Sequence, residues 1–268
     1  MRIVVQMLVR NEVDIIQECL AEIAKWGLTE IVILDGASDD GTTEAIRAFD
    51  GADIHLVSEP DPEGGFTDNL RNRLMNLTLQ HNPDWVLSLD ADEIYHTDPR
   101  MAIEVADAMG ANAIRCAVPQ FWITYADLRG GILVEDRQRS IQERRLWYSW
   151  GHSGVFIWKA HPEHYYPYPC KRPKRTPEVP GVAWNQWQKY PAVMPICKHY
   201  CFRTLEQACK RTAERIARGG RQNFGKYWLD WIIDEREAHL HRFDVDNPLW
   251  DMRYNHDAVY RWMGRHTQ

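Results

Sequence analysis

Short apolar runs alternate with helix-like segments through the first 110 residues, and this pattern constrains the fold most strongly. The apolar runs cover residues 3–9, 31–34, 54–57 and 85–89. Apolar residues recur at helical spacing in the intervening segments 11–24, 42–49 and 67–80, and Asn11 is placed to cap the first of these helices. Uninterrupted apolar strands that alternate with helices form parallel sheets covered on both faces. The sequence therefore predicts an α/β fold with a mostly parallel central sheet flanked by helices.

Beyond residue 110 the pattern is less regular. The next expected elements are a helix, two strands, a loop with five prolines and a C-terminal helix, at residues 101–109, 113–118, 154–159, 167–180 and 226–241. Another helix is expected to start at Thr204, because Gln207 completes a capping-box spacing, and to end at Gly219-Gly220. No linker divides the chain. We therefore expect one domain in which an irregular region and C-terminal helices follow the sheet.

Charge is divided unevenly along the chain. Residues 1–110 hold 7 Lys and Arg against 22 Asp and Glu, a net charge of −15, whereas residues 111–268 hold 25 against 16, a net charge of +9. The basic excess is densest in residues 139–226, with 17 basic and 5 acidic side chains. Such asymmetry marks contact with a polyanion, or else two halves that neutralise each other. Composition alone leaves both readings open.

Composition and length argue against several classes of protein. The 268 residues are 44% hydrophobic and 26% charged, as in ordinary globular proteins. No run of about 18 apolar residues is present to cross a bilayer, and the early Arg10, Asn11 and Glu12 are unlike a secretory signal peptide. Six cysteines without a Cys-x-x-Cys pair do not indicate a disulfide framework. We therefore expect a reduced, cytoplasmic protein.

Polar clusters follow three of the apolar runs. They occupy residues 10–12, 35–42 and 90–93. Ligands of open α/β sheets bind at the edge where the carboxyl ends of the strands lie, so the clusters are expected to meet there. Each cluster alone is ordinary turn chemistry. All three in this order indicate a binding site.

Asp90 and Asp92 flank Ala91 directly after the fourth apolar run. Two carboxylates separated by one residue offer the oxygen ligands that hard divalent cations prefer. Such a cation neutralises a diphosphate as it departs. The alternative is a solvated acidic turn. After a buried strand we favour the metal, and expect Asp90 and Asp92 to bind Mn²⁺ or Mg²⁺.

Taken together, the motifs resemble those of family-2 glycosyltransferases of the GT-A fold. That family has Asn-Glu after the first strand, Asp-x-x-Ser-x-Asp-Gly-Thr after the second and Asp-x-Asp after the fourth. The matching residues are Asn11, Glu12, Asp35, Ser38, Asp40, Gly41, Thr42, Asp90 and Asp92. Phe66 and Arg71-Asn72 also resemble the family, and Asp92-Glu93 resembles its subgroup of lipopolysaccharide-core transferases. The similarity covers residues 1–100.

The resemblance implies a Rossmann-like GT-A fold and a nucleotide-sugar donor, most often a UDP-sugar. Residues 1–110 would bind the donor, and residues 111–268 would form the acceptor side of the same domain. The implied donor-binding residues are Asn11, Glu12, Asp35, Ser38, Asp40, Arg71 and Asp90. Asp35 would lie near the base and ribose, Arg71 near the diphosphate or sugar, and Asp92 would bind the catalytic metal directly. Many members have a second acid where this chain has Gly36, a departure that bears on uracil recognition.

Another group of residues in the C-terminal part resembles the same subgroup. It comprises His199, Tyr200, Arg203, Thr204, Glu206, Gln207 and Lys210. A C-terminal histidine often completes the metal shell of GT-A enzymes, so the resemblance makes His199 a candidate metal ligand, against the reading of a core histidine. A rival is that Cys197, His199 and Cys201 share one face of a strand and hold zinc with Cys209, although their spacing fits no common zinc motif.

Inverting sugar transfer needs a group that removes the proton of the acceptor hydroxyl. The candidates in the acceptor region are Glu135, Asp136, Glu143 and His152. The subgroup has a His-Glu pair near His152, but Ser153 replaces the glutamate here. We therefore expect Glu143 to be the catalytic base, against the alternative that it pairs with Arg144 or Arg145 at the surface.

Tryptophans are interleaved with the basic residues, and this combination suits an anionic acceptor with rings that stack. The expected acceptor-binding residues are Lys171, Arg172, Lys174, Arg175 and Trp150. One hypothesis is DNA with a hydroxymethylated base, as in phage DNA modification, whose hydroxyl requires groove access or base flipping. Another is the phosphorylated sugar core of lipopolysaccharide or another cell-surface glycan. The alternative is a solvated basic surface with core tryptophans.

Two other classes of function compete with this interpretation. A non-catalytic sensor of sugar nucleotides would have the same donor site. A nucleotidyltransferase also combines an α/β nucleotide site with paired carboxylates, but it usually has a Gly-rich phosphate loop after the first strand, which residues 10–12 lack. The sequence therefore favours a metal-dependent, inverting glycosyltransferase in a bacterial or phage-infected cell.

Overall fold

The structure is a computed structural model that describes residues 1–61, 70–132, 136, 138–166, 177–180, 191, 194–217, 232–236, 238 and 240–242. The chain forms two compact units. The first comprises Met1–Ala117 and Ser153–Cys197, and the second comprises Val118–His152 and Lys198–Gln268. No helix within the described ranges is long and apolar enough to cross a membrane.

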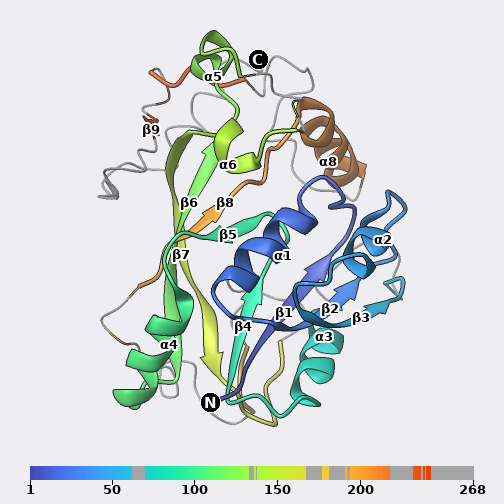
Figure 1. Cartoon of the computed structure of the whole chain (residues 1–268), viewed down its shortest axis with the longest axis vertical. Coiled ribbons are helices and arrows are strands. Elements are labelled where there is room, and N and C mark those ends of the chain that lie inside the picture. The colour runs from blue at the N-terminus through green and yellow to red at the C-terminus, as the bar shows by residue number, and fades with distance from the viewer. Residues whose placement is uncertain are drawn as a thin grey trace. The chain divides into compact units, whose positions relative to one another are not determined.

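A parallel sheet forms the centre of the first unit (Figure 1). Its strands are β1 (Ile3–Val9), β2 (Glu30–Asp35), β3 (Asp53–Ser58) and β4 (Trp85–Leu89), in the order β3-β2-β1-β4. The end of β7 (Trp147–Lys159) pairs antiparallel with β4, so that Val86 lies opposite Trp158. β4 is buried throughout, and β1 and β2 are buried beyond their first residues, which explains their uninterrupted apolar sequences. The predicted mostly parallel α/β sheet is confirmed.

Helices of the first unit follow the predicted segments with shifted ends. They are α1 (Ile16–Lys25), α2 (Thr42–Arg47), α3 (Leu70–Leu79) and α4 (Pro99–Ala108). Leu70, Leu74 and Leu77 of α3 pack in one cluster with Val4 and Val32, as their spacing predicted. A short strand, β5 (Glu93–Tyr95), follows the acidic turn after β4.

The prediction that Asn11 caps the first helix is wrong. Helix α1 starts at Ile16, and its N-cap position is Ile15, without a side-chain cap hydrogen bond. Asn11 has a φ of 57°, a left-handed conformation that asparagine tolerates better than most residues. Its side chain bonds a neighbouring loop instead, so a tertiary contact replaces the predicted cap.

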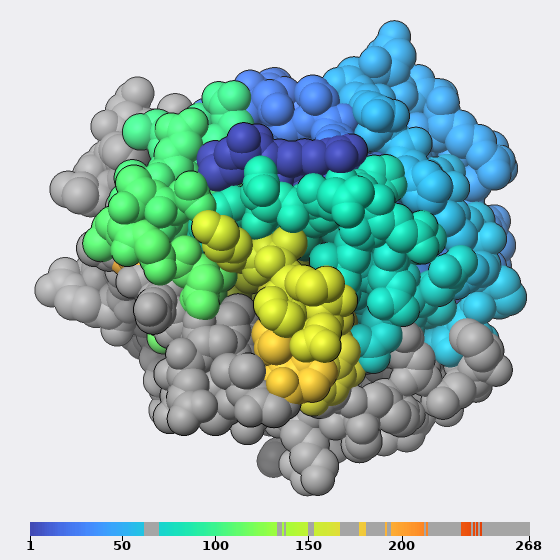
Figure 2. Space-filling view, turned by 90° about the horizontal axis from the view of Figure 1, so that it is seen from below, coloured from blue at the N-terminus to red at the C-terminus, as the bar shows by residue number. Residues whose placement is uncertain are grey.

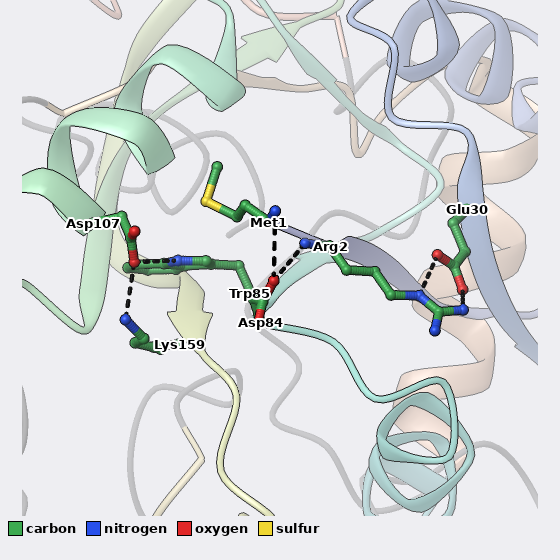
Figure 3. Close-up of polar contacts among 7 residues, drawn as sticks. All are labelled: Met1, Arg2, Glu30, Asp84, Trp85, Asp107 and Lys159. Atoms are coloured by element: carbon green, nitrogen blue, oxygen red, sulfur yellow. Dashed lines mark hydrogen bonds and ion pairs between the residues drawn. The ribbon is translucent and has the colours of Figure 1, made fainter.

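Ion pairs and hydrogen bonds lie at the end of the sheet where the parallel strands begin (Figure 3). The Arg2 guanidinium bonds Glu30 through Nη2 at 2.5 Å and Nε at 2.9 Å. Asp107 accepts from Lys159 Nζ at 2.9 Å and from Trp85 Nε1 at 3.2 Å. The hydrogen bond from Arg2 lowers the pKa of Glu30, and that from Lys159 lowers the pKa of Asp107. The sequence features associated with ligand binding lie at the opposite ends of these strands.

Residues 161–166 return to helix α3. The Asn72 amide bonds both backbone groups of Tyr166, through Nδ2 to the carbonyl at 2.8 Å and through Oδ1 from the amide at 2.6 Å. Tyr165 forms an antiparallel bridge with Glu178, and Figure 2 shows these yellow and orange segments in contact. The predicted proline-rich loop therefore has both ends fixed in the first unit, while residues 167–176 lie outside the described part of the chain.

The second unit contains the remaining short elements. They are part of β6 (Ala113–Trp122), α5 (Tyr125–Arg129), α6 (Ile141–Arg144), part of β7, β8 (Cys197–His199), α8 (Leu205–Ala217) and β9 (His241–Arg242). β6 pairs in parallel with β8, with Gln120 opposite His199. The core of this unit includes Trp122, Phe202 and Ile233.

Helix predictions in this part of the chain are partly confirmed. α8 begins after Thr204, whose Oγ1 accepts from the Gln207 amide at 3.0 Å, but the Gln207 side chain reaches Arg203 N and Cys201 O in place of Thr204 N. The helix predicted over residues 226–241 does not extend through its described part. Ile233 bridges to Thr124 there, because its backbone hydrogen bonds go to Ile123 and Tyr125 instead of to helical partners. Gly219 and Gly220 lie outside the described residues.

Candidate functional site

Strands β1, β2 and β4 end at one edge of the sheet. The register pairs Val9 with Asp35 and Met7 with Leu89. The polar clusters that follow these strands therefore start at neighbouring positions. This is the edge at which open α/β sheets bind ligands.

The loops after β1 and β2 are joined by hydrogen bonds. Asn11 N donates to Ser38 Oγ at 2.8 Å, and Asp39 N donates to Asn11 Oδ1 at 3.0 Å. Glu12 N donates to Thr42 Oγ1 at 2.8 Å. The structure thus brings together Asn11, Glu12 and Ser38, three of the residues expected to bind a donor.

Asp35 is the buried centre of the second loop. Its side chain is fully buried and accepts from Ser38 N at 3.1 Å, Ser38 Oγ at 2.5 Å, Thr43 Oγ1 at 2.6 Å and Ser58 Oγ at 2.9 Å. A carboxylate with several donors fixes a loop strongly, because bonds to a charged acceptor are stronger than neutral ones. Asp35 therefore fixes the conformation of the loop beside the site through buried hydrogen bonds.

Asp40, Gly41 and Thr42 form the turn into helix α2. Asp40 Oδ1 accepts from Thr42 N at 3.0 Å and Oγ1 at 2.5 Å, while Oδ2 accepts from Val13 N at 3.2 Å. Gly41 has a φ of 98° at the N-cap of α2, a conformation that favours glycine. The Asp-Gly-Thr part of the motif is therefore explained by the conformation of this turn, in addition to any role in ligand binding at the strand edge.

A tight acidic turn follows β4. Glu93 N donates to Asp90 O, and Asp90 N donates to Glu93 Oε2, both at 3.1 Å. Asp92 and Glu93 are 5% and 1% exposed, whereas the side chain of Asp90 is 28% exposed. Burial raises the pKa of Glu93 well above its usual value, and the charge of Asp92 adds to the effect. The buried Glu93 side chain therefore fixes the backbone of the turn at Asp90.

Arg71 brings a positive charge to this turn. Its Nη2 lies 4.0 Å from Asp90 Oδ1, and the arginine is largely buried at the start of α3. A cation beside two or three carboxylates can contact a phosphate while the carboxylates hold a metal ion. Arg71, Asp90 and Asp92 are thus brought together as the sequence resemblance implied.

A divalent metal fits the chemistry of this turn. Within the described ranges, no three His, Cys, Asp or Glu side chains are grouped so as to hold a metal ion. Mg²⁺ commonly uses only one or two protein carboxylates, with substrate phosphates and water completing its shell. Asp90 and Asp92 match that donor set. Cys197, Cys201 and Cys209, all described, form no such group with His199, so the structure gives the zinc alternative no support. His199 forms no such group with Asp90 and Asp92 either.

Candidates on the acceptor side occupy varied positions. Glu143 lies at the third position of α6 and forms a capping box with Ser140, whose amide donates to Glu143 Oε2 at 3.0 Å. Asp136 pairs with Arg139 at 3.4 Å, and His199 is half-buried in β8. Several predicted residues or their side chains lie outside the described part of the chain: Phe66, Glu135, Trp150, His152, Lys171, Arg172, Lys174 and Arg175.

Sequence reasoning missed the buried acids of the second unit. Asp127 accepts from Thr124 Oγ1 at 2.9 Å, and burial raises its pKa to about 6. Glu235 accepts from Ala126 N at 3.1 Å and also bonds Arg129. The Thr-x-x-Asp spacing signals the first contact, but no local pattern signals the second because its partners are over 100 residues apart.

The comparison with protein families agrees with the strand-edge motifs. The model of the glycosyl transferase family 2 matches residues 4–160, more than half of the chain. No curated protein matches the chain. One similar solved structure is a Bacillus anthracis protein assigned as a glucose-1-phosphate thymidylyltransferase, in complex with a sucrose. Its identity is 13% over 44% of this chain and 55% of that chain, with a TM-score of 0.31. The match thus spans about half the length of that structure. With its Rossmann-like sheet and the family motifs at the sheet edge, the chain belongs to glycosyl transferase family 2.

Proposed function

We propose that this chain is a metal-dependent, inverting glycosyltransferase that moves a sugar from a UDP-sugar to a hydroxyl of a polyanionic acceptor. The main support is the acidic turn after β4, where Asp90 and Asp92 lie beside Arg71. The hydrogen-bonded loops after β1 and β2 begin at the same sheet edge. A nucleotide diphosphate needs this mixture of a metal-binding acid pair and a fixed cation.

Donor binding is assigned to residues of the first unit. Asp90 and Asp92 would hold Mn²⁺ or Mg²⁺, which neutralises the diphosphate as it leaves. Arg71 would contact the diphosphate or the sugar. The nucleotide would be surrounded by residues of the two loops: Asn11, Glu12, Ser38 and Asp40. Asp35 would stabilise these loops through its buried hydrogen bonds.

Two residues of the second unit have proposed roles in the reaction. Glu143 would accept the proton of the acceptor hydroxyl, whose oxygen then attacks the anomeric carbon as the bond to the nucleotide breaks. Attack from the face opposite the leaving group inverts the anomeric configuration. His199 would provide an additional metal ligand.

The proposed acceptor is DNA with a hydroxymethylated base. The basic residues Lys171, Arg172, Lys174 and Arg175 belong to the segment whose ends, Tyr166 and Glu178, are fixed in the first unit. Their charge, with Trp150, suits phosphates and stacked bases. The described cysteines are free thiols, which agrees with a cytoplasmic site of action.

A binding titration tests the acceptor. The chain is mixed with duplex DNA containing 5-hydroxymethylcytosine over increasing salt. Binding at micromolar or lower concentration that weakens steeply with salt supports the proposal, because phosphate contacts release counterions. Absence of binding at low salt, with transfer to a phosphorylated lipopolysaccharide core, favours the cell-surface glycan as acceptor. A chain that binds UDP but turns over no donor is a sugar-nucleotide sensor.

A further inference from the structure

Helix α1 connects two parts of the candidate donor site within the first unit. Just before the helix, Glu12 O accepts from Ile15 N at 3.0 Å and from Ile16 N at 2.9 Å, while Glu12 N is bonded to Thr42 Oγ1 of the second loop at 2.8 Å. The helix packs against β5, the strand that directly follows the acidic turn (Figure 1). It therefore joins the loops after β1 and β2 to the region of the acidic turn.

Cys19 bonds the acidic turn from the middle of α1. Its Sγ donates to Glu93 O at 3.3 Å and lies 3.8 Å from Asp90 O. Cys19 is only 1% exposed, on the buried face of α1 that also contains Ile16, Leu20 and Ile23. A thiol is a weak hydrogen-bond donor, but water does not compete for it when it is buried. The carbonyls at both ends of the turn therefore face a donor on α1.

The bond from Cys19 differs from the other contacts of the turn. The hydrogen bonds from Asp90 N to Glu93 Oε2 and from Glu93 N to Asp90 O, both at 3.1 Å, are internal to the turn and set its shape. The thiol attaches the turn to a separate helix. Because Asp90 and Asp92 move with the backbone of the turn, its displacement would shift both carboxylates and the 4.0 Å approach of Arg71 Nη2 to Asp90 Oδ1.

We propose that Cys19 is a positioning residue that fixes the acidic turn, and with it Asp90 and Asp92, to α1. The inference rests on the proposed function, in which these two carboxylates hold the metal ion. Contacts that support metal ligands typically change metal affinity by about 10–100-fold. A thiol is a weak donor, so its loss should have an effect at the lower end of that range or just below it.

Three substitutions separate the hydrogen bond from the volume of the side chain. Cys19→Ser keeps a donor in a smaller side chain, Cys19→Val fills the space without a donor, and Cys19→Ala removes both. Ile23→Val is the matched control, because Ile23 lies one turn further along the same buried face and has no polar side-chain atom. Unfolding curves accompany each variant, and Cys19→Ala decides the question if Cys19→Val does not fold.

Two measurements on the full chain test the proposal. Hydrogen exchange by mass spectrometry follows the amides of the acidic turn without metal or nucleotide, and calorimetry measures Mn²⁺ binding with UDP present. In Cys19→Val and Cys19→Ala, exchange should be faster and Mn²⁺ binding weaker, each by about three- to tenfold, as expected for the loss of one hydrogen bond. Cys19→Ser should stay close to the wild type. Ile23→Val should match the wild type in both measurements, which accounts for any general loss of stability.

The opposite order of the variants overturns the proposal. If Cys19→Val matches the wild type and Cys19→Ser changes as much as Cys19→Ala, volume matters and the bond does not. Unchanged exchange in both Cys19→Val and Cys19→Ala also overturns it.

Asp92→Asn separates this inference from the proposed function. If Asp92→Asn abolishes Mn²⁺ binding while the Cys19 variants match Ile23→Val, the positioning role is wrong and the proposed function stands. If Asp92→Asn leaves Mn²⁺ binding unchanged, the proposed metal role fails, whereas the exchange of the turn amides still decides whether Cys19 fixes the turn.

Discussion

Replacing Asp35 should destabilise the first unit, because this buried carboxylate organises the loop after β2. Asp35→Ala removes the acceptor of four hydrogen bonds, from Ser38 N, Ser38 Oγ, Thr43 Oγ1 and Ser58 Oγ. Asp35→Asn keeps the shape and one acceptor oxygen but removes the charge. The two substitutions therefore separate loss of the partner from loss of the charge.

The expected loss of stability depends on which of these donors can bond water once the carboxylate is removed. Ser58 is exposed and Ser38 half-buried, so their hydroxyls can bond water, while Thr43 is buried and loses its partner. A hydrogen bond to a charged group contributes about 1.5–3 kcal/mol, so losing about two of them predicts a cost of about 4 kcal/mol for Asp35→Ala. Asp35→Asn should cost about half of that. In a domain of this size 1 kcal/mol lowers Tm by about 2–4 °C, so the alanine variant should melt about 10 °C lower.

Urea unfolding of purified variants measures these free energies. The matched control is Asp39→Asn, the same substitution at an exposed position of the same loop, with an expected change below about 0.5 kcal/mol. Equal stability of Asp35→Asn and the control would refute the reasoning. Unchanged stability together with weaker UDP binding would show that the carboxylate serves the nucleotide directly.

Further predictions concern three other acids. Glu143→Gln preserves the capping box but removes the proposed base, so kcat should fall about 10²–10⁴-fold with unchanged unfolding, and equal kcat would exclude the base role. Glu93→Ala should weaken Mn²⁺ binding in calorimetry because Asp90 N loses its acceptor, while Glu93→Gln should retain more of it; the opposite order would contradict the anchoring role. Asp127 has a folded pKa of about 6, above its unfolded value, so its contribution to stability is complete below about pH 4 and is lost as pH rises to about 6. Asp127→Asn should flatten that dependence in unfolding measured from pH 4 to 7, and an unchanged slope would contradict it.

The fold was predictable where local pattern and burial agree. β1, β2 and β4 are covered on both faces, so their apolar runs identify them without tertiary information. The failures occur where long-range pairing decides. Ile233 pairs with residues 123 and 125 and leaves the predicted helix, and Asn11 bonds Asp39 instead of capping α1.

The sequence predicted which residues lie at the candidate site better than it predicted what each residue does there. Spacing identified Asp35, Asp90 and Asp92 and their common sheet edge. It did not show that Asp35 is buried among hydroxyls, or that Glu93 bonds the Asp90 backbone. The hydrogen bonds from Arg144 and Arg145 to the carbonyls of Phe202 and Arg203 join positions nearly 60 residues apart, which no periodicity reveals.

The most direct test of metal-dependent sugar transfer measures UDP release and sugar transfer over a panel of UDP-sugars with Mn²⁺ and hydroxymethylated DNA. The wild type should turn over at least one donor, require the metal, and lose about 100-fold or more of its rate in Asp92→Asn, because the metal stabilises the departing diphosphate by several kcal/mol. Asp39→Asn should keep the wild-type rate. Full turnover by Asp92→Asn, or no turnover of any donor by a wild type that binds UDP, would contradict the account.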